Sequence, residues 1–103
     1  MIKVDFVLKN NFYTELTIKG HANYAESGSD IVCSAVSAFG VGGLNAIQKI
    51  KGYEPKYKVN DGFINVLFET DETSQIIAKT LYVQLKSVEE SYGKFIKIKI
   101  TNM

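Results

Sequence analysis

Residues 30–52 read DIVCSAVSAFGVGGLNAIQKIKG, a long apolar segment that decides the fold. Aspartate is a favoured N-cap, because its carboxylate accepts a hydrogen bond from a free N–H of the first helical turn, and Asp30 precedes the segment. The stretch therefore predicts a helix over 31–51 that Asp30 caps and that ends before Gly52. Its apolar face is formed at helical spacing by Val32, Val36, Phe39, Gly43, Ile47 and Ile50.

Three glycines, Gly40, Gly42 and Gly43, stand in the middle of this predicted helix. Each glycine costs up to about 1 kcal/mol relative to alanine in a helix interior. Close approach of another backbone, from a sheet or from a second subunit, would compensate for that cost. A break near residue 40 is the competing explanation, and the sequence leaves both open.

The segments around this helix alternate between apolar and polar residues, which is typical of half-buried strands. Residues 2–20 predict a β-hairpin with its turn at Asn10-Asn11, and residues 21–29 predict a loop. Residues 55–59 and 63–69 predict a second hairpin around Asn60-Asp61-Gly62.

A second helix is predicted to open at Asp71-Glu72, where the helix dipole favours acidic residues, and to stop at Gly93. Its apolar stripe consists of Ile77, Leu81, Leu85 and Val88, and residues 96–101 predict a last strand. The order ββαββαβ predicts an α+β fold in which two helices pack on a mostly antiparallel five-stranded sheet. Residues 1–103 are expected to form a single domain.

Composition excludes several classes of protein. The formal net charge is +1, which does not resemble the basic footprint of a stand-alone nucleic-acid-binding protein, although Lys94, Lys97 and Lys99 gather near the last strand. A single cysteine forms no internal disulfide. The first ten residues resemble no signal peptide, and no apolar run is expected to approach the roughly 20 residues that span a membrane. We therefore expect a cytoplasmic protein that does not bind a membrane.

The only histidine, His21, begins the loop at 21–29, and the only cysteine, Cys33, follows this loop. With Asp30 as N-cap, Cys33 would lie in the first helical turn, where the helix dipole and a nearby histidine favour a thiolate. Free N–H groups at the helix start would stabilise an oxyanion, so the segment contains the groups that acyl transfer needs. Tyr24 would supply an apolar contact to a substrate.

Simpler interpretations compete with this site. A lone cysteine on an apolar helix is usually buried packing, and a lone histidine at a strand end is usually a turn or surface residue. Asp30 is most simply a cap, and Ser37 is most simply a polar residue one turn past Cys33. No metal site is expected, because one histidine and one cysteine fall short of the three or four ligands of a zinc site.

The segment Gly20-His21-Ala22, a short loop, and Asp30-Ile31-Val32-Cys33-Ser34-Ala35-Val36-Ser37 closely resemble the signature of the bacterial ribosomal-processing cysteine protease family, Prp. The similarity in element order extends over the whole chain. Ser34 stands where alanine is also common in the family.

The resemblance implies a cysteine endopeptidase that removes the N-terminal extension of a large-subunit ribosomal protein, after a phenylalanine-rich segment. It implies a catalytic pair of Cys33 and His21, contributions from Asp30 and Ser37, and a homodimer. Gly20, Ala22, Tyr24 and Ser34 are expected to bind substrate or support the site. No cofactor, membrane or direct nucleic-acid contact is required for this activity.

Two other functions remain possible on the sequence alone. A non-catalytic module would bind a ribosomal protein or ribosomal RNA through the lysines at 94–99 and would not depend on Cys33. A thioesterase or acyltransferase would use the same pair of Cys33 and His21, and activity on a thioester would distinguish it.

Overall fold

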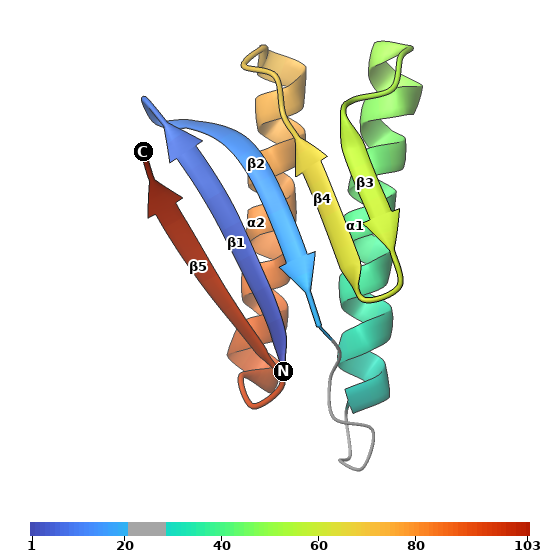
Figure 1. Ribbon diagram of the computed structural model, residues 1–103, viewed down its shortest axis with the longest axis vertical. Helices are drawn as coiled ribbons and strands as arrows, with labels where there is room; N and C mark the ends of the chain where they lie inside the picture. The colour runs from blue at the N-terminus through green and yellow to red at the C-terminus, as the bar shows by residue number, and fades with distance from the viewer. Residues whose placement is uncertain (21–28) are drawn as a thin grey trace.

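The computed structural model describes residues 1–20 and 29–103, with side chains in the first helix described from Ile31 onward. The predicted order ββαββαβ is confirmed (Figure 1). The elements are β1 Ile2–Lys9, β2 Phe12–Lys19, α1 Ser29–Lys51, β3 Tyr57–Asn60, β4 Phe63–Leu67, α2 Glu72–Tyr92 and β5 Ile96–Asn102.

The five strands form one sheet in the order β3-β4-β2-β1-β5. Only the pairing of β1 with β5 is parallel, and the other three pairings are antiparallel, as predicted for a mostly antiparallel sheet. Figure 1 shows that α1 and α2 lie on the same face of the sheet, α2 behind β1 and β2, and α1 behind β4 and β3. The fold therefore has two layers, and the core lies between them.

Turn chemistry fixes both hairpins. Asn10 and Asn11 adopt φ values of 52° and 67°, and Gly62 adopts 68°, so these turns use the left-handed conformations that Asn and Gly tolerate best. Strand β3 begins at Tyr57 rather than at the predicted residue 55, because Pro55 has no N–H to donate to a ladder. Strand β4 ends at Leu67, two residues earlier than predicted.

Helix α1 is continuous from Ser29 to Lys51, so a break near residue 40 is excluded. It begins earlier than predicted, and Asp30 is its second residue. Asp30 therefore does not precede the helix as an N-cap; that prediction is wrong, although a first-turn aspartate still complements the helix dipole. The earlier start makes Cys33 the fifth residue of α1 rather than the third.

Two of the helix glycines allow close approach, as expected, but to side chains rather than to another backbone. A Cβ on Gly40 would lie 2.8 Å from Cδ1 of Ile64 in the sheet. A Cβ on Gly43 would lie 2.5 Å from Cδ1 of Leu81 in α2. A Cβ on Gly42 would have no described neighbour within 4 Å, so packing within the chain does not explain this glycine.

The core is formed by the inward-facing residues of the sheet and of both helices. On α1 the predicted face is confirmed for Val32, Val36 and Ile47, which are buried, but Ile50 is 65% exposed. On α2, Leu81 and Leu85 are buried as predicted, while the sheet contributes the apolar residues Ile2, Val4, Phe6, Leu16, Ile18, Ile64, Val66 and Ile96.

By length and composition alone, Ile31–Lys51 is apolar enough to cross a bilayer, with a mean hydropathy of 1.5. The expectation that no apolar run approaches 20 residues is therefore wrong. In this fold the same helix is the one whose apolar face packs over β4 and α2, which accounts for its hydrophobicity. The core helix of a two-layer protein meets the same criterion as a membrane span.

Helix α2 begins after Asp71, whose carboxylate accepts a hydrogen bond from the Ser74 N–H at 3.2 Å. The predicted acidic start is thus an N-cap. The helix ends at Tyr92, before Gly93 as predicted, but Gly93 has φ −58° and so ends the helix without a left-handed turn.

Candidate active site

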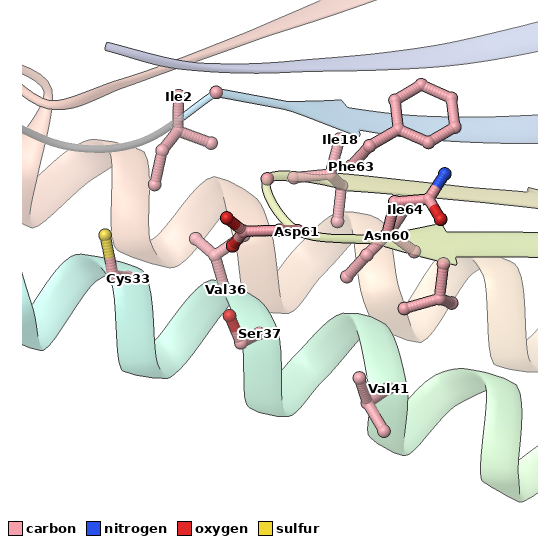
Figure 2. Close-up of a pocket in the computed structure, with 13 residues that line it drawn as sticks. Ile2, Ile18, Cys33, Val36, Ser37, Val41, Asn60, Asp61, Phe63 and Ile64 are labelled. Atoms are coloured by element: carbon pink, nitrogen blue, oxygen red, sulfur yellow. The ribbon is translucent and has the colours of Figure 1, made fainter.

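A pocket of about 280 Å³ lies between the N-terminal half of α1 and the edge of the sheet formed by β2, β4 and β3 (Figure 2). Polar groups line part of it, from Cys33 and Ser37 on α1 and from Asn60 and Asp61 in the β3–β4 turn. The rest of its lining is apolar or glycine: Ile2, Ile18, Gly20, Val36, Val41, Val59, Gly62, Phe63 and Ile64.

Cys33 is a free, half-buried thiol that both interpretations of the sequence describe in part. It packs against the hydrophobic core, as the buried-packing interpretation expects. It also lines the pocket, and Figure 2 shows its sulfur directed from α1 toward the sheet. A substrate in the pocket would therefore meet the thiol.

Ser37 follows Cys33 by four residues and lines the same pocket. Residues four apart on a helix share one face, so the periodicity that predicted α1 also places this hydroxyl one turn beyond the thiol. In Figure 2 the Ser37 hydroxyl points toward the sheet, as the Cys33 sulfur does.

Gly20 directly follows β2 at the pocket, in a conformation that other residues adopt only with strain. Its φ is +96°, and a Cβ there would lie 2.6 Å from the carbonyl oxygen of Met1. Its N–H donates a 2.9 Å hydrogen bond to the carbonyl of Gly62 in the β3–β4 turn. Gly20 therefore fixes where the chain leaves the sheet before His21.

The β3–β4 turn is the part of the pocket that sequence reasoning missed. The motif Asn60-Asp61-Gly62 was identified only as a turn, because nothing in its spacing shows which element it will face. The strand order places β3 at the edge of the sheet over α1, and Figure 2 shows the Asp61 carboxylate pointing from the turn toward the Cys33 end of the pocket.

The structure thus brings together three of the predicted site residues, Gly20, Cys33 and Ser37. Ser34 is exposed and is not among the residues that line this pocket, and its role in the site stays a prediction. The predictions for His21, Ala22 and Tyr24 fall outside the described residues, as does the side chain of Asp30.

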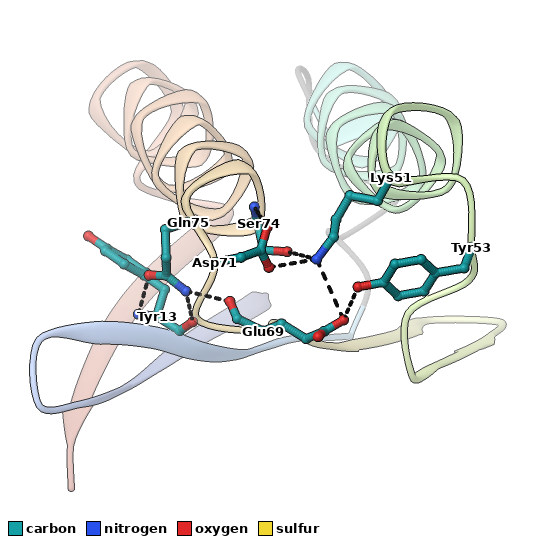
Figure 3. A network of polar contacts seen from close by, with 7 residues as sticks. All are labelled: Tyr13, Lys51, Tyr53, Glu69, Asp71, Ser74 and Gln75. Atoms are coloured by element: carbon teal, nitrogen blue, oxygen red, sulfur yellow. Dashed lines mark hydrogen bonds and ion pairs between the residues drawn. The ribbon is translucent and has the colours of Figure 1, made fainter.

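A network of polar contacts lies at the opposite end of α1 (Figure 3). The Lys51 ammonium donates to Asp71 at 2.6 Å and to Ser74 at 3.0 Å, and it lies 3.5 Å from Glu69. These contacts raise the pKa of Lys51 and lower the pKa of Asp71, chiefly through their shared hydrogen bond. Within residues 1–20 and 29–103, no group of three or more His, Cys, Asp or Glu side chains is arranged to hold a metal ion.

Comparison with known proteins shows the family to which this chain belongs. The family model for the cysteine protease Prp matches residues 1–97. The chain belongs to the Prp family of cysteine proteases. The ribosomal processing cysteine protease Prp of Staphylococcus aureus is 32% identical over 103 residues, covering 95% of this chain and 97% of the relative. The Bacillus subtilis protein of the same name is 30% identical over 87 residues, covering 77% and 78%.

Solved structures support the same family. Staphylococcus aureus Prp in complex with a substrate peptide superposes with a TM-score of 0.85 at 30% identity, covering 98% of this chain and all of that one. The same protein with a covalently linked product peptide gives a TM-score of 0.87 at 31% identity and the same coverage. A Streptococcus mutans structure, at 23% identity and a TM-score of 0.90, shows the shared fold.

Proposed function

We propose that this Prp-family protein is an endopeptidase that removes the N-terminal extension of a large-subunit ribosomal protein, with Cys33 as nucleophile and His21 as general base. The observation that carries the proposal is the pocket itself. It contains the chain's single cysteine, and its rim includes Gly20, the residue directly before the chain's single histidine.

The chemistry follows from these two side chains. His21 accepts the thiol proton, and the Cys33 thiolate attacks the scissile carbonyl to form a tetrahedral oxyanion. Helix α1 begins at Ser29, so the first four N–H groups of the helix lack intrahelical acceptors and are available to donate to that oxyanion. Collapse of the intermediate breaks the C–N bond, and the imidazolium protonates the leaving amine.

Hydrolysis of the thioester completes the cycle. His21 removes a proton from water, the hydroxide attacks the acyl carbon, and the thiolate leaves and regains its proton. Asp30 is proposed to orient His21 or to complement the dipole of α1. Asp30→Asn removes the charge in either case, so the readout separates the roles: loss of the dipole interaction lowers stability, whereas loss of His21 orientation lowers turnover at unchanged stability. Ser37, one turn beyond the thiol, is proposed to hydrogen-bond the substrate backbone.

The substrate class is supported by what the pocket and the relatives have in common. The names of the relatives give ribosomal processing as their activity, and one solved relative holds a substrate peptide. The apolar lining here, which includes Ile18, Val36 and Val59, suits an apolar side chain next to the cleaved bond. A phenylalanine-rich segment before the cleavage site meets that requirement.

The proposal is tested by cleavage of a peptide that spans the predicted junction. Cys33→Ala and His21→Ala are each expected to lower kcat/KM by at least about 10³-fold while the circular dichroism spectrum is unchanged. The matched control is Ser87→Ala, which removes an exposed hydroxyl of α2 and is expected to retain wild-type turnover. Full activity of the Cys33→Ala protein would exclude the proposal, and turnover of a thioester but not of the peptide would favour a thioesterase.

The homodimer and the cytoplasmic location stay predictions. Multi-angle light scattering after size-exclusion chromatography tests the first: a mass of twice 11.5 kDa supports a dimer, and 11.5 kDa contradicts it.

A further inference from the structure

Both helices cover one face of the sheet, so no described element covers the other face (Figure 1). Alternate residues of a strand point to opposite faces. Because Val4, Ile18 and Ile64 are buried under the helices, their neighbours point to the uncovered side. We call this side, formed by the outward-facing residues of β5, β1, β2 and β4, the open face.

The strand register places lysines next to one another on the open face. Lys97 pairs with Lys3 across β5 and β1, Lys3 pairs with Lys19 across β1 and β2, and Lys19 pairs with Phe63 across β2 and β4. Neighbouring strands lie about 4.8 Å apart, so these four residues form a continuous row. Lys99 lies two residues along β5, on the same side as Lys97.

One carboxylate of the open face lies within this group of lysines: Asp5 pairs with Lys99 across β1 and β5 and offsets part of the positive charge. Asp5 accepts a hydrogen bond from the Thr101 hydroxyl at 3.0 Å, and Glu15 accepts one from the Asn65 side chain at 2.8 Å. Two other lysines, Lys51 and Lys86, form ion pairs with carboxylates.

The Lys97 ammonium is turned around the edge strand toward the end of α2. It lies 3.7 Å from the position that a Cβ on Gly93 would take and near Glu89, which also binds Lys86 and the Ile98 N–H. A net charge of +1 for the whole chain therefore hides a local excess of positive charge.

The open face is also hollowed. A shallow groove of about 480 Å³ is lined by Lys3, Val4, Asp5, Thr17, Lys19, Lys97, Ile98 and Lys99. Phe63 pairs with Lys19 across β2 and β4 and so lies next to this groove, and Figure 2 shows its ring on the side of the sheet away from α1, although the residue also lines the Cys33 pocket. Lysines along a groove with an aromatic ring at its end are the combination that binds the phosphates and stacks the bases of a single strand.

We propose that the open face binds single-stranded RNA, with Lys3, Lys19 and Lys99 contacting phosphates and Phe63 stacking on a base. A second copy of the chain does not fit this face, because a two-fold interface would set lysine against lysine. The choice of RNA over DNA rests on the proposed function, since a ribosomal protein is assembled beside ribosomal RNA. The RNA would hold the protease near its substrate, whereas peptide cleavage itself would not need it.

The test is fluorescence anisotropy of a labelled single-stranded RNA of about 12 nucleotides, titrated with the full chain at several salt concentrations. We expect a Kd near 10⁻⁵ M at about 50 mM NaCl, weakening with a log–log salt slope of about 2, as for roughly three phosphate contacts. The double variant Lys3→Gln/Lys99→Gln is expected to weaken binding about tenfold and to lower the slope by about 1.4.

The matched control is Lys49→Gln/Lys79→Gln, which removes the same charge from exposed positions on the two helices and is expected to change the Kd less than about twofold. Equal losses in the two double variants, or a Kd weaker than about 10⁻⁴ M for the wild type, would overturn the proposal. Tighter binding to DNA of the same sequence, or to vesicles of anionic phospholipid, would overturn it as well.

Peptide cleavage without RNA separates this proposal from the proposed function. The Lys3→Gln/Lys99→Gln protein is expected to cleave the peptide at the wild-type rate, which shows that it is folded. If the wild-type protein binds RNA but cleaves no peptide, the proposed function fails while the RNA proposal stands.

Discussion

The two ends of helix α1 differ in how they are held. At the C-terminal end, Lys51 joins the cap of α2 through Asp71 and Ser74, and Tyr53 donates its hydroxyl proton to Glu69 (Figure 3). Near the N-terminal end, Cys33 and Ser37 face an open pocket instead of a partner element. One helix thus has an anchored end and an accessible end, and the anchored end can hold the thiol in place without filling the space that a substrate needs.

One buried side chain, that of Gln75, connects the region around the anchored end to the sheet. Gln75 accepts a hydrogen bond from the Tyr13 N–H and donates to the Tyr13 and Glu69 carbonyls, each at 2.8 Å. These bonds join α2 to β2 and to the end of β4. Near the accessible end, the hydrogen bond of Gly20 to Gly62 constrains the backbone where the chain leaves β2. It does not hold helix α1 itself.

The first prediction would break the anchored end. Gln75→Ala removes three hydrogen bonds at once and leaves buried backbone groups unpaired, so it is expected to destabilise the fold by about 3 kcal/mol. Urea denaturation measures the loss. Lys79→Ala, an exposed position on the same helix, is the control and is expected to stay within about 0.5 kcal/mol of the wild type. A loss below about 1 kcal/mol for Gln75→Ala would show that the sheet does not depend on this contact.

The second prediction would break the accessible end. Gly20→Ala forces an L-residue into φ +96° and places its Cβ against the Met1 carbonyl, so it is expected to cost about 2 kcal/mol of stability. Because Gly20 directs the chain toward His21, peptide cleavage should fall more than the folded fraction does. Denaturation and cleavage measured on the same sample give both values. A variant with wild-type turnover per folded molecule would show that the exit from β2 does not position the histidine.

The third prediction, with the smallest expected effect, concerns how the stability of the anchored end depends on pH. The hydrogen bonds from Lys51 and Ser74 hold the pKa of Asp71 below its ordinary value near 3.8, so its contribution to stability is present above that value and is lost as the pH falls through the folded-state pKa. Thermal melts of the wild type between about pH 5 and pH 2 should therefore fall more steeply than those of Asp71→Asn.

Asp71→Asn keeps a capping side chain, and at pH 7 its melting temperature should be only a few degrees lower than that of the wild type. Parallel curves for the two proteins would show that the ion pair with Lys51 does not contribute in the folded state. Peptide cleavage at pH 7 is expected to be the same in both, because the substitution lies at the anchored end.

Local patterns predicted the elements well, and long-range pairing explains what they missed. Alternation and the Asn10-Asn11 turn sufficed for the first hairpin, and the 3.6-residue spacing placed Cys33 and Ser37 on one face of α1. The position of Asp61 followed from the strand order, which no local spacing encodes. The Lys51 network was also missed, because it joins residues about 20 positions apart that meet only once both helices lie on one face.

At the start of α1, by contrast, a local signal was present but placed the first residue of the helix wrongly. Asp30 carried a strong capping signal, yet α1 begins at Ser29, since capping propensity is a local preference that neighbouring residues can shift by a residue or two. The same uncertainty moved Cys33 from the first turn to the fifth helical residue. The pocket still contains the thiol, because the side of the helix on which it lies depends on periodicity and not on where the helix starts.

The parallel pairing of β1 with β5 has a consequence for when this protein becomes active. Ile2 pairs with Ile96, and the Ile2 N–H donates to the Phe95 carbonyl, although Ile2 also lines the pocket. A pairing between residues this far apart in sequence closes late in folding, because the whole intervening chain must first be made and ordered. Ile2 in the pocket wall therefore gains its hydrogen bond to Phe95 only after that part of the chain has been synthesised, so a nascent chain that stops before Phe95 lacks this support of the wall.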